Sequence, residues 1–66
     1  MKPNELKAEL TRNGRNYAEM ANALGISVVA FQRKINGETE FKSSEISALK
    51  TELKLTADRV AEIFFN

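Results

Sequence analysis

The stretch at residues 16–37, NYAEMANALGISVVAFQRKING, contains the signals for two short helices and a very tight turn between them. Asn16 is a favourable N-cap, and Glu19 three residues later completes a reciprocal capping arrangement. A helix is therefore predicted at residues 17–24. Gly25 can adopt the left-handed conformation that ends such a helix, so both of its ends are marked in the sequence.

The second helix of this stretch is predicted at residues 28–36, because Ser27 can cap it only two residues after the glycine. Ile26 before that cap and Phe31 in the second turn are spaced to form a hydrophobic staple. Asn36-Gly37 then supplies the end of the helix. So short a connection makes the two helices cross steeply, as they do in a helix-turn-helix unit.

At a steep crossing the two backbones come close together. Ala21 and Gly25 fit such a place because larger side chains would clash there, and Ile26 fills the corner. An ordinary helical hairpin without a nucleic-acid role is the alternative interpretation. The helix-turn-helix interpretation is favoured by five features at fixed offsets: Asn16, Ala21, Gly25, Ile26 and Phe31.

The rest of the chain predicts three further helices, and no useful length of it alternates with the period of a strand. These helices are expected at residues 5–12, at residues 44–53 and after Thr56, with N-caps at Asn4, at Ser43 or Ser44 and at Thr56. Phe41, in the polar loop between the third and fourth helices, is expected to plug the edge of the core, with stacking on a base as the lesser alternative. The predicted fold is all-α, a compact bundle of five short helices forming a single domain at residues 1–66.

The apolar spacing within these helices defines a predicted core. Its members are Leu6, Leu10, Met20, Ala21, Leu24, Ile26, Phe31, Ile35, Leu49, Leu53, Leu55, Val60 and Phe64. In the final stretch, Ile63-Phe64-Phe65, a last helical turn that completes the core explains Phe64 well and Phe65 poorly. We therefore expect Ile63 and Phe65 at this end to contact a partner.

Composition narrows the possible functions. The 66 residues contain no Cys and no His, which removes disulfides, thiol chemistry and the usual transition-metal ligands. Scattered carboxylates without a phosphate-cradling glycine loop argue against an enzyme, and no cofactor, metal or small-molecule ligand is expected. No apolar run approaches membrane-spanning length and no signal-peptide pattern is present, so a cytoplasmic protein is expected.

The net charge of the chain is only +1, but its distribution is uneven. Residues 1–34 carry a balance of +3 and residues 35–66 a balance of −2. A mild dipole of this kind would turn the helix-turn-helix half of the protein toward DNA.

With these residues in view, the stretch at residues 16–37 resembles the lambda-repressor-like family, the helix-turn-helix group of phage repressors, Cro proteins and their bacterial relatives. The resemblance extends over essentially the whole chain. It includes the tripeptide NGE at residues 36–38, the segment FKSSEISALKTELKLT at residues 41–56, and the ending AEIFF at residues 61–65. That ending is most similar to the very small regulators of phages and prophages in low-GC bacteria. The resemblance implies a DNA-binding transcriptional regulator whose third helix enters the major groove of an operator.

The outward residues of the predicted third helix then become candidates for base contact, and the residues around it candidates for phosphate contact. The base-contact candidates are Ser27, Val28, Val29, Gln32 and Arg33. The phosphate-contact candidates are Arg12, Arg15, Asn16, Tyr17, Lys34 and Asn36. For the two arginines before the second helix, solvated surface charge is an equally good interpretation.

Two departures from the lambdoid pattern reduce the expected base readout. Family members commonly have glutamine at the positions of Tyr17 and Val28, and an apolar residue at the position of Lys34. With Val28 and Val29 present, fewer hydrogen bonds to bases are available, and a preference for A/T pairs is expected. Lys34 is expected to lay its stem on the core and direct its ammonium toward phosphate.

The partners expected from the sequence are therefore double-stranded DNA and a second copy of the chain. A regulator of repressor or Cro type would bind a roughly palindromic operator as a homodimer that need not persist away from DNA. The alternative, from another class of function, is an antitoxin-like helical interaction module that uses the same fold without specific DNA readout. A steep fall of DNA affinity with salt would favour the first.

Overall fold

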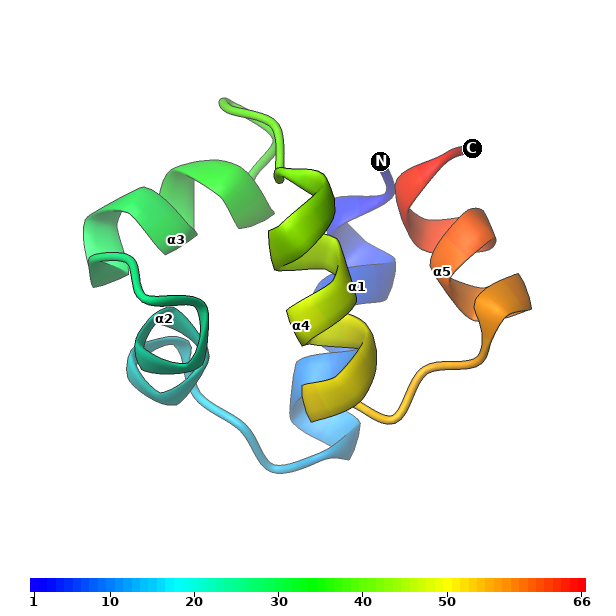
Figure 1. The fold of residues 1–66 in the computed structure, drawn as a ribbon, viewed down its shortest axis with the longest axis horizontal. Coiled ribbons are helices and arrows are strands. Elements are labelled where there is room, and N and C mark those ends of the chain that lie inside the picture. Colours follow the sequence, from blue (N-terminus) through cyan, green and yellow to red (C-terminus); the bar gives the residue numbers. More distant parts are fainter.

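The computed structural model describes all of residues 1–66 and contains five α-helices and no strand (Figure 1). The helices are α1 (Pro3–Arg12), α2 (Tyr17–Leu24), α3 (Val28–Ile35), α4 (Ser43–Glu52) and α5 (Ala57–Phe64). The prediction of an all-helical chain with five helices is therefore confirmed.

Two predicted helix starts differ from the structure. α1 begins at Pro3 rather than at residue 5, and Asn4 is not its cap: proline is favoured in a first turn, where its missing N–H would have no partner. α4 begins at Ser43, so neither Ser43 nor Ser44 is its cap. The preceding residue, Lys42, instead donates its backbone N–H to the carboxylate of Glu45 at 2.7 Å.

The predicted caps of the other three helices are confirmed. The Asn16 side chain accepts the N–H of Glu19 at 2.8 Å, and the Glu19 carboxylate accepts the N–H of Asn16 at 3.0 Å. The hydroxyls of Ser27 and Thr56 cap α3 and α5 by accepting backbone N–H groups three residues later, at 3.0 and 3.1 Å. Local sequence therefore sets where these helices begin.

The core is formed by eleven buried hydrophobic residues from all five helices and the turn before α5. They are Leu6, Leu10, Met20, Ala21, Phe31, Ile35, Leu49, Leu53, Leu55, Ile63 and Phe64. Ten were predicted, and three other predicted members, Leu24, Ile26 and Val60, lie partly buried at its edge. Phe41 also packs at the core edge as predicted, edge-to-face with Phe31 and Phe64 at ring-centroid distances of 6.0 and 5.8 Å.

The arrangement separates two ends of the molecule. α2 and α3 lie together on one side, α4 crosses the middle in front of α1, and α5 lies on the other side (Figure 1). The two ends of the chain meet beside α5, where the backbone N–H of Lys2 donates to the carbonyl of Ile63 at 2.7 Å (Figure 1). None of the five helices combines the length and the apolar character needed to cross a membrane.

Candidate nucleic-acid interface

The connection between α2 and α3 has the tight geometry that its sequence predicts. Gly25 ends α2 with φ at 70°, the left-handed conformation that glycine adopts readily. The N–H of Ile26 then donates to the carbonyl of Ala21 at 3.0 Å, which closes the turn. Ser27 begins the capping of α3 at once, so only three residues separate the two helices.

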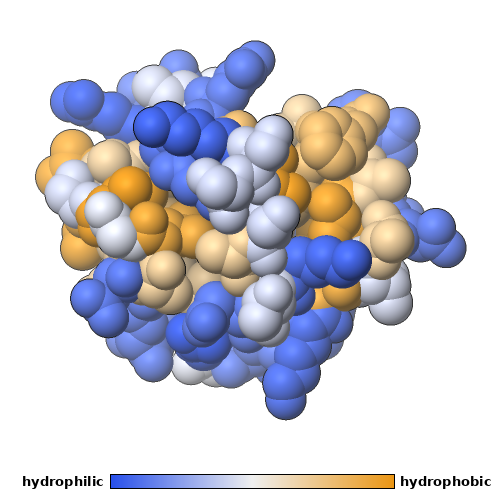
Figure 2. Space-filling model, in the orientation of Figure 1, coloured by the Kyte–Doolittle hydropathy of each residue, from blue (hydrophilic) through white to orange (hydrophobic).

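All five base-contact candidates lie on the exposed surface of α3 and its cap: Ser27, Val28, Val29, Gln32 and Arg33. We call these residues the α3 outer strip. Val28 and Gln32, and likewise Val29 and Arg33, are four residues apart and so lie on one face of the helix. Val28 is 39% exposed and Val29 is 56% exposed, so two adjacent apolar side chains face solvent at the start of α3. Hydrophobic atoms are visible on the side of the molecule formed by α2 and α3, and also on the side of α5 (Figure 2).

Arg33 and Lys34 are neighbours in the sequence with opposite surroundings. Arg33 is exposed and has no carboxylate within 4.0 Å. Lys34 donates its ammonium to Oε1 of Glu45 at 2.8 Å and to the carbonyl of Glu40 at 3.1 Å. Its side chain is only 13% exposed, so the prediction that the Lys34 ammonium points toward phosphate is wrong. The sequence identified Lys34 as unusual but not the carboxylate that it binds.

Three of the other phosphate-contact candidates lie at the ends of α2 and α3. Asn16 is exposed, but its side-chain oxygen is occupied in capping α2. Tyr17 is half-buried, with its ring edge-to-face against Phe31 at 5.4 Å. Asn36 is exposed at the end of α3. These three residues share the α2–α3 side of the molecule with the α3 outer strip.

The two remaining phosphate-contact candidates are arginines held by carboxylates elsewhere. Arg15 donates to the Glu52 side chain at 2.7 Å and to the Glu52 carbonyl at 3.3 Å, which ties the α1–α2 connection to the end of α4. Arg12 is paired with Glu9 at 2.8 Å and lies beside the α4–α5 turn, around a second hollow that also includes Lys54 and Arg59. Arg12 is therefore not brought together with the α3 outer strip.

A network of charges that the sequence did not reveal joins α1 to α5. Arg59 donates to Glu9 at 2.7 Å, to Glu5 at 2.9 Å and to Glu62. These bonds raise the pKa of Arg59 above its ordinary value. Burial raises the pKa of Glu9, but hydrogen bonds from Arg59 and Arg12 lower it more, so it lies below its ordinary value.

The two buried carboxylates carried a signal in the sequence that was overlooked. Glu9 falls on the same face of α1 as Leu6 and Leu10, and Glu45 lies four residues before the core residue Leu49. A carboxylate at an inward-facing position must find a cation or a hydrogen-bond donor. This rule predicts that each is paired, but not with which cation.

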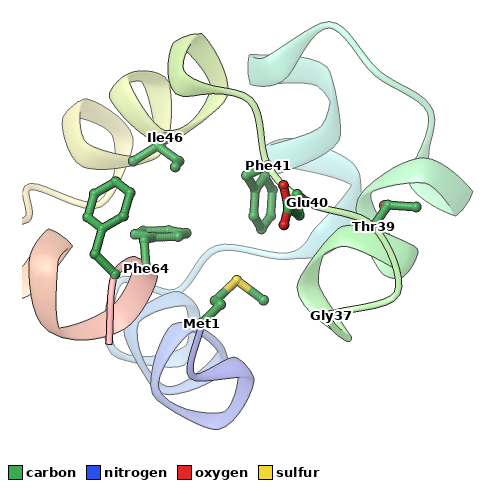
Figure 3. Close-up of a pocket in the computed structure, with 8 residues that line it drawn as sticks. Met1, Gly37, Thr39, Glu40, Phe41, Ile46 and Phe64 are labelled. Atoms are coloured by element: carbon green, nitrogen blue, oxygen red, sulfur yellow. The ribbon is translucent and has the colours of Figure 1, made fainter.

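The two dimer candidates are separated by the structure. Ile63 is fully buried in the core, so its assignment to an interface is wrong; Phe65 is 72% exposed. Phe65 borders a surface hollow of about 490 Å³, into which Met1, Phe41, Ile46 and Phe64 also point (Figure 3). Glu40 lines the same hollow and is in no ion pair.

Comparisons of the chain with protein-family models, with curated proteins and with solved structures found no match. The function is therefore argued from the residues and geometry described above.

Proposed function

We propose that this chain is a sequence-specific DNA-binding transcriptional regulator of the phage repressor or Cro type, with a lambda-repressor-like fold. In this proposal α2 and α3 form the helix-turn-helix, and α3 enters the major groove of an operator. The single observation that carries it is the α3 outer strip, in which exposed valines lie beside a glutamine and an arginine that is free of carboxylates.

The chemistry of the α3 outer strip suits base edges. Arg33 can donate two hydrogen bonds to the O6 and N7 acceptors of guanine, and Gln32 can pair with adenine. Val28 and Val29 offer only methyl groups, which suit the methyl group of thymine. Two exposed valines on an otherwise well-packed chain cost hydration free energy, and a partner surface would recover it.

The ends of α2 and α3 supply contacts to the sugar-phosphate backbone. The N-terminus of α2 favours anions through its helix dipole, and Asn16 and Tyr17 add polar groups there. Asn36 adds an amide at the far end of α3. Arg12, Arg15 and Lys34 are in ion pairs, so we expect the fall of affinity with salt to be less steep than the number of basic candidates in the sequence would give.

A homodimer would contact two half-sites of the operator at once. One α3 outer strip is too short to discriminate usefully between DNA sequences, and the second copy adds its contacts to those of the first. We assign its interface to Phe65 and the adjoining hollow, which is also lined by Gly37, Thr39, Glu40 and Phe41 of the loop after α3. Each copy offers an exposed aromatic ring beside a hollow lined largely by hydrophobic residues, and a two-fold interface would pair these features of the two copies. Lys2 and Glu40, neither of which is in an ion pair, lie near this surface and could pair between copies.

A second candidate function is a protein-interaction module in which Val28 and Val29 dock onto another protein. The same exposed valines favour it, because an apolar patch serves a protein partner as well as a thymine-rich groove. Arg33 separates the two candidates. Its free guanidinium is explained by guanine or phosphate, whereas apolar docking leaves it without a role.

The proposed function is tested by selecting bound DNA from a random pool. We expect enrichment of one roughly palindromic sequence and a fall of affinity for it as salt is raised. Enrichment without a consensus would leave only non-specific binding, and no retained DNA at low salt would favour the interaction module.

A further inference from the structure

The last turn of α3 is fastened to the first turn of α4 by a single pair of side chains. Lys34 and Glu45 meet at 2.8 Å, and their side chains are only 13% and 8% exposed. The same carboxylate oxygen, Oε1 of Glu45, also accepts the backbone N–H of Lys42 at 2.7 Å. One oxygen atom therefore joins the end of α3 to the beginning of α4.

This pair connects two helices that each pack more extensively against α2 than against each other. The connection also includes the intervening loop, because the Lys34 ammonium donates to the carbonyl of Glu40 at 3.1 Å and lies 5.9 Å from the centre of the Phe41 ring. These charged side chains therefore add a direct restraint between α3 and α4 to the packing of both helices on α2.

We propose that Lys34 and Glu45 are positioning residues that set the direction of the α3 outer strip, and that they determine discrimination between DNA sequences without touching DNA. The inference rests on the proposed function. It replaces a direct phosphate contact by Lys34 with an indirect role inside the protein.

The geometry of a short helix explains why such a pair affects discrimination. α3 has eight residues and is about 12 Å long, so a tilt of about 5° at its fastened end moves its other end by about 1 Å. Hydrogen bonds to base edges need distances and angles within narrow limits, so such a shift weakens them. Electrostatic contacts between basic side chains and phosphates depend much less on a shift of this size, so non-specific DNA binding is largely unaffected.

The test uses Lys34→Met, Glu45→Gln and the double variant, with Lys50→Met as the matched control. Met keeps the length of the lysine stem, and Gln keeps an oxygen that can accept the Lys42 N–H. The double variant is the main one, because it leaves no unpaired carboxylate and should fold. Lys50 is exposed on α4 and is in no ion pair, so its variant loses a charge without losing this connection.

We expect the double variant to lose at least tenfold in the ratio of affinities for selected and scrambled DNA, with unchanged affinity for scrambled DNA and an unchanged salt slope. Lys50→Met should keep the ratio. A double variant that keeps the ratio overturns the proposal. So does an equal loss on both DNAs with a reduced salt slope, because that result identifies Lys34 as a phosphate contact.

A measurement without DNA keeps this inference separate from the proposed function. Residual dipolar couplings report the orientation of α3 relative to α4, and we expect them to change in the double variant and not in Lys50→Met. If the unmutated protein binds all DNA sequences equally well, the proposed function fails. The couplings still test whether Lys34 and Glu45 set the orientation of α3. Unchanged couplings in the double variant overturn the positioning role in either case.

Discussion

The outer and inner faces of α3 belong to one eight-residue helix, yet their surroundings are opposite. The outer face presents Val28 and Val29 to solvent. On the inner face Phe31 and Ile35 are fully buried, and in the last turn Lys34 is held by a carboxylate and a carbonyl. A helix that makes specific contacts needs an open surface on one face and a fixed orientation on the other, and this division supplies both.

The largest expected effect comes from weakening the buried face of α3. Ile35→Ala should reduce the free energy of unfolding by about 2–5 kcal/mol, because it removes a fully buried side chain and leaves a cavity. Val29→Ala on the exposed face should change it by less than about 0.5 kcal/mol. Urea denaturation of both variants measures the contrast. Equal losses would show that the two faces of α3 are similarly packed.

A loss of stability within the same range is expected when the ion pair in the last turn of α3 is broken. Lys34→Met should cost roughly 3 kcal/mol, because it leaves Glu45 nearly buried without its cation. Adding Glu45→Gln should restore most of that loss, since no charge then remains buried. Thermal unfolding of the single and double variants checks this, and a double variant no more stable than Lys34→Met would show that the charge was not the cause.

Phe65, the exposed aromatic residue that follows α5, tests the proposed dimer interface in the same way. Phe65→Lys should weaken binding to a full palindrome about tenfold, or about 1.4 kcal/mol, with little change on a single half-site. Removing an exposed ring should leave the stability of the monomer nearly unchanged. Equal affinities of the unmutated protein for full and half sites would rule out the cooperative dimer.

The smallest effect is a change of stability with pH. The pKa values of Glu9 and Glu45 lie below the ordinary 4.5, so both carboxylates stabilise the folded state while they are ionised in it. Stability is therefore expected to be flat from pH 8 to 5 and to fall as pH drops below about 4.5 through the lower folded-state pKa values. Thermal unfolding across this range tests the sign, and Glu9→Gln should show a shallower acid loss.

The sequence predicted what depends on local signals. The caps at Asn16, Ser27 and Thr56 and the glycine turn at Gly25 act within a few residues of each other, so their positions in the sequence were sufficient. The α3 outer strip was predictable from helical periodicity, since residues on the face opposite the buried stripe of a helix must face outward.

The partners of the charged residues could not be predicted in the same way. Arg59 lies 50 residues from Glu9, and Arg15 lies 37 residues from Glu52, so only the packing of the helices brings them together. The starts of α1 and α4 were displaced for a related reason, because Pro3 and Glu45 provide helix-starting groups that the search for polar caps overlooked.

The claim that the α3 outer strip reads DNA is tested most directly by measuring how Arg33→Ala changes the affinity for the selected DNA and for a scrambled sequence. We predict a loss of about 1–3 kcal/mol on the selected DNA, relaxed preference at one base pair, and little change on the scrambled sequence. Lys50→Ala, which removes an exposed and unpaired charge from α4, should preserve the preference. Unchanged specific affinity in Arg33→Ala, with the unfolding free energy also unchanged, would contradict the account.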